Sequence, residues 1–203
     1  ELISRLQRNN WIRLRTLILL RWIAILGQIT AITVAQRVYN LQLELGLCYL
    51  AIGISVIGNL IAISVFPESK RLSEFENFLM VLFDLLQLAF LLYLTGGLHN
   101  PFALLVLGPV TVAANVMGLR STLFIGATAI ILVTLLADFH IPLRTANGFV
   151  HETPPLFVYG NWVAIIIAII FMSAYSRRIN SEMRSMSDAL AATQLALSRE
   201  QKL

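Results

Sequence analysis

The sequence contains few charged residues and almost no cysteine. Charged residues make up 13% of its 203 positions, and hydrophobic residues make up 58%. A soluble domain carries about 25% charged residues and about 45–50% apolar ones. A water-soluble fold of this length cannot bury so much apolar surface, so the composition indicates a membrane protein. The one cysteine, Cys48, excludes an internal disulfide and a cysteine metal cluster; its apolar neighbours predict a small buried hydrophobe.

Acidic residues are outnumbered by basic ones, which gives a net charge of +4. A basic chain can indicate binding to nucleic acid. Here the lysines and arginines do not form one continuous patch, because they lie at the ends of apolar runs. The charge pattern therefore argues against a nucleic-acid partner and for contact with a lipid bilayer.

Six apolar runs approach or exceed the roughly 17–25 residues that a membrane span requires. They cover residues 17–35, 45–66, 78–95, 102–118, 121–137 and 156–175. We therefore predict an all-α membrane protein, with a six-span transmembrane domain over residues 17–175. Only Leu119 and Arg120 separate the fourth and fifth runs, which predicts a tight hairpin with Gly118 as the C-cap of the fourth helix. Pro154 and Pro155 are placed to begin the sixth helix.

Lysine and arginine fall almost entirely on one side of the predicted spans. Only Arg37 and Arg144 lie on the other side, and Arg21 lies just inside the first span. Because basic loops stay in the cytoplasm, both termini are predicted to be cytoplasmic. The loops 36–44, 96–101 and 138–155 are then predicted to face outward.

The two terminal segments have residue patterns that differ from those of the apolar runs. Residues 1–16 mix apolar side chains with arginines, which fits either an interfacial helix or a basic flank that fixes the topology. Residues 176–203 carry a 4-3-4-3-4 spacing of mostly apolar residues, namely Ile179, Met183, Met186, Leu190, Thr193 and Leu197. That spacing is typical of a coiled coil, so a cytoplasmic dimerisation helix is expected to follow the sixth span.

The outward turn after the third span combines features of a well-formed turn with features of a ligand site. It consists of Gly96, Gly97, Leu98, His99, Asn100, Pro101 and Phe102. Asn100 fits the N-cap and Pro101 the first position of the following helix, and both roles are purely structural. His99, the Asn100 amide and free N–H groups could also hydrogen-bond a carbonyl, with Phe102 supplying an aromatic face. A quinone at the bilayer surface has the matching chemistry.

These seven residues resemble the GGxxNPF motif of the RegB/PrrB family of redox-sensing membrane histidine kinases. Further similarity lies in Leu14-Arg15-Thr16-Leu17 with Leu20-Arg21-Trp22, and in the continuation from Asn100 to Pro109. The resemblance extends over essentially the whole chain. It implies a bacterial inner-membrane sensor domain that binds ubiquinone or ubiquinol at Gly96, Gly97, His99, Asn100, Pro101 and Phe102. It also implies a homodimeric kinase and a partner response regulator.

The kinase chemistry itself is not expected within these residues. Phosphotransfer requires a cytoplasmic phospho-accepting histidine and a glycine-rich ATP-binding domain, whereas His99, His140 and His151 are all predicted to face outward. We therefore expect the chain to be the sensor part of a longer phosphotransferase. No metal or haem is expected, because the histidines lie on one side of the bilayer and His140, His151 and Glu152 match no ligand spacing.

A second group of candidate residues lies within the spans. A charge in the hydrocarbon costs about 2.5–3.5 kcal/mol or more, so it normally faces a protein partner. We predict that Asp84 pairs with Arg21, and that Asn59, Gln87 or Asn115 completes a polar cluster that couples the outer turn to the cytoplasmic helix. The alternative is that Arg21 extends to the headgroups and Asp84 is protonated.

Two other functions compete with a quinone sensor. A small six-helix transporter or channel is disfavoured, because the spans carry few polar residues and no inverted repeat is apparent. A quinone-handling redox enzyme would need a metal or haem ligand set that the sequence does not show.

Overall fold

The computed structural model describes residues 2–65, 73–150 and 153–200, and most of these residues are helical. The helices are α1 (Leu2–Arg37), α2 (Leu45–Val65), α3 (Glu74–Leu94), α4 (Leu107–Val116), α5 (Leu119–Asp138) and α6 (Pro155–Glu200). Two 3-10 helices, η1 (Gly97–His99) and η2 (Pro101–Val106), lie between α3 and α4. Within the described ranges, five helices are long and apolar enough to cross a membrane, and Pro101–Val116 forms a shorter apolar helix. The predicted all-α membrane fold is confirmed.

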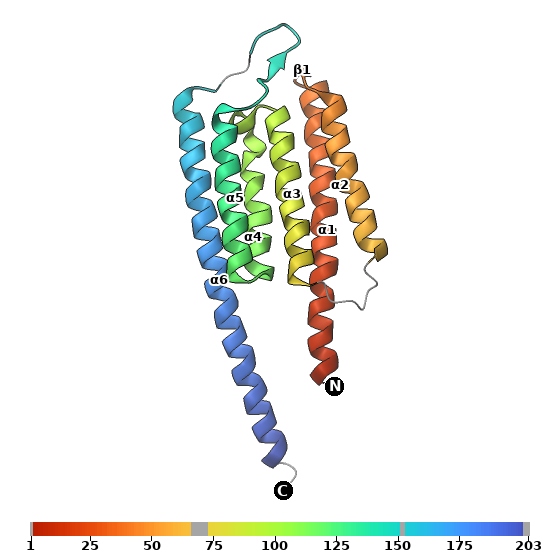
Figure 1. Cartoon of the computed structure of the whole chain (residues 1–203), viewed down its shortest axis with the longest axis vertical. Helices are drawn as coiled ribbons and strands as arrows, with labels where there is room; N and C mark the ends of the chain where they lie inside the picture. The colour runs from red at the N-terminus through yellow and green to blue at the C-terminus, as the bar shows by residue number, and fades with distance from the viewer. Residues whose placement is uncertain (1, 66–72, 151–152, 201–203) are drawn as a thin grey trace.

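The helices form two packed groups that share α3 (Figure 1). Helices α3, α4, α5 and α6 enclose the larger apolar core, in which Leu85, Val110, Ile125 and Ile169 are almost completely buried. A smaller cluster joins α1 and α2 to the outer end of α3, and it contains the fully buried Cys48. Because α3 contributes to both cores, it is the helix through which the two groups are packed together.

The fourth span differs in detail from its prediction. Its first six residues, Pro101–Val106, form a 3-10 helix before the α-helix starts at Leu107. Its C-cap is Met117, so the prediction of Gly118 as that cap is wrong; Gly118 is instead the N-cap of α5, with an ordinary φ of −69°. The reason for a glycine there is proximity, since a Cβ on Gly118 would lie 2.8 Å from Glu74 Oε1.

Glu74 ties the start of α3 to the α4–α5 hairpin. Its carboxylate accepts hydrogen bonds from the Gly118 N–H at 3.1 Å and from the Ser121 hydroxyl at 3.0 Å. A carboxylate at the first turn of α5 also interacts favourably with the helix dipole. The tight turn between α4 and α5 is therefore capped by a residue far away in the sequence.

At the opposite end, two loops join the helix groups through a small antiparallel pair of strands. Strand β1 (Leu41–Gln42) follows α1, and β2 (Arg144–Thr145) lies between α5 and α6. Hydrogen bonding continues past the strands, because Ala146 donates its N–H to the Asn40 carbonyl at 3.0 Å. We call this end of the bundle, which also carries η1, the outer end.

Both chain termini lie beyond the other end of the bundle (Figure 1). Helix α1 is continuous from Leu2, so residues 2–16 of the predicted basic segment belong to the same helix as the first span. Helix α6 has 46 residues and hence a length of about 70 Å, well over the thickness of about 30 Å of a bilayer core. Much of α6 thus extends out of the membrane, as expected for a helix leaving the sixth span.

Candidate functional site

The outer turn is built around two glycines in left-handed conformations. Gly96 has a φ of +98° and Gly97 a φ of +57°, values that other residues adopt only with strain. The space around them is also filled. A Cβ on Gly96 would lie 2.8 Å from the Leu143 side chain, and one on Gly97 would collide with the Leu136 carbonyl and the His140 side chain. The two glycines therefore let η1 pack closely onto the end of α5 and the loop that follows it.

Asn100 holds the turn together with both ends of its side-chain amide. Its Oδ1 accepts a hydrogen bond from the Phe102 N–H at 2.9 Å, which is the predicted N-cap interaction. Its Nδ2 donates to the Thr95 hydroxyl at 2.8 Å and to the Thr95 carbonyl at 3.2 Å. Asn100 thus connects the end of α3 to the start of η2, and Pro101 occupies the first turn as predicted.

His99 connects the turn to both ends of the loop between α5 and α6. Its Nδ1 accepts a hydrogen bond of 3.0 Å from the Thr153 N–H. Its ring lies against that of His140, with 4.8 Å between the ring centroids. An imidazole nitrogen that accepts a hydrogen bond carries no proton, so Nδ1 is the acceptor atom of His99 in this contact.

The predicted ligand groups are therefore engaged within the protein. The Asn100 amide and free N–H groups at the helix start were predicted as possible donors to a ligand carbonyl, but Asn100 donates to Thr95 and accepts from the Phe102 N–H. Phe102 itself is 47% exposed on the bundle surface. Quinone binding by Gly96, Gly97, His99, Asn100, Pro101 and Phe102 stays a prediction, and a ligand at the turn would have to compete with these contacts.

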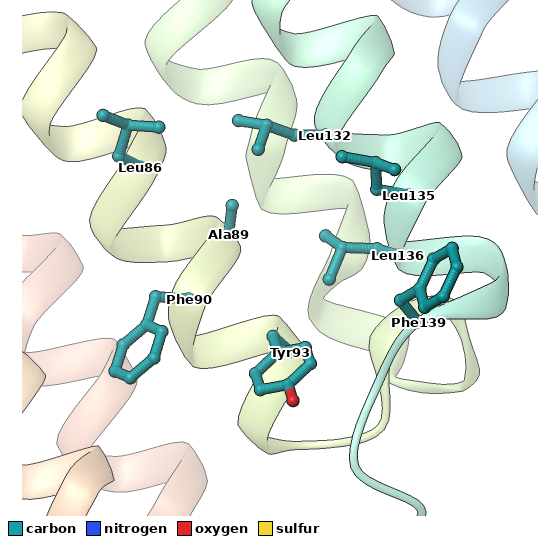
Figure 2. Close-up of a pocket in the computed structure, with 8 residues that line it drawn as sticks. All are labelled: Leu86, Ala89, Phe90, Tyr93, Leu132, Leu135, Leu136 and Phe139. Carbon is teal, nitrogen blue, oxygen red and sulfur yellow. The ribbon is translucent and has the colours of Figure 1, made fainter.

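An apolar groove of about 540 Å³ lies between the outer halves of α3 and α5. Eight residues line it: Leu86, Ala89, Phe90, Tyr93, Leu132, Leu135, Leu136 and Phe139. Figure 2 shows Tyr93 and Phe139 at one end of the groove and Leu86 and Leu132 at the other. Ala89 and Leu136 are buried, Leu132 is partly buried, and the other lining side chains are exposed on the surface of the bundle. No pattern in the sequence predicted this groove.

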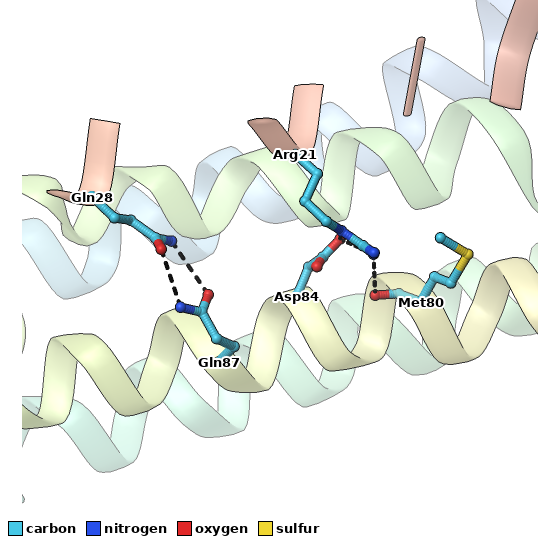
Figure 3. Close-up of polar contacts among 5 residues, drawn as sticks. All are labelled: Arg21, Gln28, Met80, Asp84 and Gln87. Carbon is cyan, nitrogen blue, oxygen red and sulfur yellow. Dashed lines mark hydrogen bonds and ion pairs between the residues drawn. The ribbon is translucent and has the colours of Figure 1, made fainter. Parts of the chain in front are cut away.

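Arg21 and Asp84 form the predicted ion pair between α1 and α3 (Figure 3). The Arg21 guanidinium donates to Asp84 Oδ2 through Nη2 at 2.7 Å and Nε at 3.1 Å, and its Nη2 also donates to the Met80 carbonyl. The Arg21 side chain is 8% exposed and that of Asp84 is 30% exposed. The guanidinium thus lies in the helix interface, and the alternative in which Arg21 extends to the headgroups is wrong.

The other predicted members of this cluster have different surroundings. Gln87 exchanges two hydrogen bonds, of 3.1 and 3.3 Å, with Gln28 on α1. Asn115 donates to the Thr111 carbonyl in its own helix at 2.9 Å. Asn59 is fully buried, and neither of its amide atoms has a hydrogen-bond partner among the described residues. The cluster is therefore an ion pair and an amide pair, both joining α1 to α3.

Gln28 was not among the predicted members of the cluster. It lies seven residues after Arg21, so two helical turns place both polar side chains on the same face of α1. That spacing within an otherwise apolar run is a signal that was present in the sequence.

The described residues contain no group of three or more metal-ligating side chains. His140 lies beside His99, whereas His151 and Glu152 fall outside the described residues.

Comparison with known proteins agrees with this architecture. The family model described as the PilS-like transmembrane domain, a six-span family, matches residues 4–152. Two curated relatives from Cereibacter sphaeroides, both named sensor histidine kinase RegB, are 54% identical over 202 residues. The match covers 100% of this chain and 44% of each relative, so the chain spans less than half the length of these proteins. No solved structure matches the chain.

The Arg21–Asp84 pair should give a measurable coupling free energy. We expect Asp84→Asn and Arg21→Gln each to lower the free energy of unfolding, because each leaves the other polar group without its partner inside the bundle. The double variant should lose less free energy of unfolding than the two single variants lose in sum, and the difference should be at least about 1 kcal/mol. SDS-induced unfolding in mixed micelles measures all four proteins.

Gln28→Leu and Gln87→Leu provide the matched control cycle, for which we expect a coupling of about 0.6 kcal/mol, as for neutral interhelical hydrogen bonds. Additive effects of the Asp84 and Arg21 substitutions would contradict the pairing.

Gly97→Ala should destabilise the domain by about 1–3 kcal/mol, because alanine is strained at this φ and its Cβ would meet Leu136 and His140. The buried Cys48 thiol reports unfolding when it reacts with a maleimide dye during heating. Gly108→Ala is the control, since a Cβ there has no neighbour within 4 Å. Equal melting temperatures for the two variants would show that the turn does not need its left-handed glycine.

Proposed function

The chain belongs to the family of PilS-like transmembrane domains, and on that premise we propose that it is the membrane sensor domain of a two-component histidine kinase. The similarity to the RegB sensor kinases over the full 203-residue chain supports this proposal. Autophosphorylation and transfer to a response regulator would then be carried out by a kinase region that follows these residues. In this proposal the protein lies in the bacterial inner membrane with both termini in the cytoplasm.

The proposed signal is the redox state of the quinone pool, read through binding of ubiquinone or ubiquinol at the outer end. Two features support this ligand: the motif at Gly96, Gly97, His99, Asn100, Pro101 and Phe102, and the apolar groove beside the turn. Quinone carbonyls only accept hydrogen bonds, whereas quinol hydroxyls also donate them. His99 bonds the Thr153 N–H, and a ligand that exchanged this bond would alter the contact between the turn and the start of α6.

The observation that carries the proposal is the position of η1. This short helix contacts α3, α5 and α6 together, and α6 then continues without a break to Glu200. A change at the turn can therefore alter the packing of a helix that runs through the membrane and out of it. Such a helix can transmit a signal to a downstream domain without any other moving element.

The size of the expected response follows from hydrogen-bond energetics. One net hydrogen bond contributes about 1 kcal/mol, whereas moving a two-state equilibrium from 1:99 to 99:1 requires about 5.5 kcal/mol. A difference of one hydrogen bond between quinone and quinol therefore changes the equilibrium by roughly fivefold. The proposed sensor is graded and does not act as an on/off trigger.

A homodimer is proposed from the exposed part of α6. Met186 is 76% exposed and Leu190 is 63% exposed, and both belong to the heptad spacing of residues 179–197. Large apolar side chains on a helix that has left the membrane are stabilised when a second copy covers them.

The proposal is tested by replacing the corresponding part of a C. sphaeroides RegB kinase with this chain, in frame after Leu203. We expect autophosphorylation in proteoliposomes to differ severalfold between oxidised and reduced ubiquinone. His99→Ala should reduce that difference, because it removes the contact with Thr153.

Asn100→Asp and Asn100→Ala form a matched pair for the same assay. Aspartate keeps the acceptor that caps Phe102 but loses the amide donor to Thr95, whereas alanine loses both. A chimera that responds normally with His99→Ala and with Asn100→Ala would overturn the proposed role of the turn. A folded chimera that is insensitive to quinone redox state would overturn the proposed function.

A further inference from the structure

The groove between α3 and α5 has the shape and chemistry of a site for an elongated amphipathic ligand. Its volume of about 540 Å³ lies within the range of about 300–1,000 Å³ typical of small-molecule sites. Its lining is hydrocarbon except for the Tyr93 hydroxyl. A long apolar ligand with one polar end matches such a surface.

The polar end of the groove is set by Tyr93. Its side chain is 40% exposed, and its hydroxyl makes no hydrogen bond within the described part of the chain. The aromatic ring of Phe139 lies at the same end of the groove, and Phe90 lies on the α3 side (Figure 2). A planar ring with a carbonyl could therefore bond the Tyr93 hydroxyl and contact aromatic faces there.

The groove and the outer turn share a structural element. Leu136 forms part of the groove, and its backbone carbonyl lies against Gly97. The Tyr93 carbonyl accepts a hydrogen bond of 2.8 Å from the Ile141 N–H, so the ends of α3 and α5 are joined at this point. Residues of the glycine motif do not line the groove, but they determine where one of its walls lies.

We propose that this groove holds the quinone, with the ring at Tyr93 and Phe139 and the isoprenoid tail along Leu86 and Leu132. The assignment rests on the proposed function and locates its ligand. In this proposal the glycine turn does not bind the quinone directly. It positions the groove wall at Leu136, and a displacement of that wall is passed through the turn to α6. A quinone dissolved in the bilayer would enter sideways, because most of the lining residues are exposed on the surface of two helices long and apolar enough to cross a membrane.

Photolabelling of the purified chain in nanodiscs with an azido derivative of ubiquinone tests the site. We expect the cross-link on peptides that contain Tyr93 and Phe139, and we expect unlabelled ubiquinone to compete with it. A titration of the same preparation gives the dissociation constant. Tyr93→Phe should weaken binding of the oxidised form by about two- to tenfold, the effect of one lost hydrogen bond.

The groove can also be filled from its buried side. Ala89→Leu should abolish saturable binding, because Ala89 is a buried lining residue between the two ends of the groove. Tyr159→Phe is the matched control for the hydroxyl, since Tyr159 is an exposed tyrosine near the outer end of α6, as Tyr93 is near the outer end of α3. Ala127→Leu is the control for added volume on an exposed face of α5. Melting followed at Cys48 shows whether each variant is folded.

The outcomes separate the groove from the proposed function. Saturable binding that survives both Tyr93→Phe and Ala89→Leu, with the label at Phe102 or elsewhere, overturns the groove and leaves quinone sensing intact. Labelling that excess phospholipid displaces as well as ubiquinone does would identify a groove for acyl chains and overturn the assignment. Absence of saturable binding in the wild-type chain would overturn both the groove and the quinone proposal.

Discussion

The absence of water from the hydrocarbon core is the constraint on which this structure depends. Polar groups there must find partners within the protein, because each unsatisfied group is costly. Arg21 and Asp84 meet this requirement together, and so do Gln28 and Gln87. Hydroxyl groups within the helices find an acceptor in their own helix, as when Thr111 donates to the Leu107 carbonyl one turn earlier. Asn59 departs from the pattern, because it is fully buried and has no hydrogen-bond partner among the described residues.

The same constraint explains why α3 is central. Its face toward α1 carries the polar partners Asp84 and Gln87, and its other faces contribute apolar residues to both cores. At its inner end Glu74 caps the α4–α5 hairpin, and at its outer end Thr95 is bonded by Asn100. Helix α3 is thereby joined to α1, to the hairpin and to the outer turn by polar contacts, which have stricter geometry than apolar packing. The remaining helices are held to it mainly by van der Waals contact.

How much the sequence predicts depends on the range of the interaction. The helices over the predicted apolar runs, the start of α6 at Pro155 and the Asn100 cap follow from local composition and spacing, and the structure has each of them. The Arg21–Asp84 contact is long-range, but two charges in apolar runs at similar depths have few alternative partners. Gly118 was misplaced because its neighbour Glu74 is 44 residues away, and a local rule cannot include it. The groove lies between two helices, α3 and α5, that are not consecutive in the sequence. It is defined by the space left between their side chains, and no sequence pattern encodes that space.

In the proposed mechanism, the unequal restraint of the helices determines where a bound ligand has its effect. A ligand changes an equilibrium only by its difference in affinity between two arrangements, so a quinone in the groove must favour one spacing of α3 and α5 over another. Helix α3 is held from the other side by the Arg21 ion pair and the Gln28 amide pair. Among the described residues no side-chain hydrogen bond or ion pair joins α5 to α1, and α5 packs against α3, α4, α6 and η1. The helix proposed to adjust is then α5, and the adjustment would pass to α6, which contacts the outer turn at η1 and continues to Glu200.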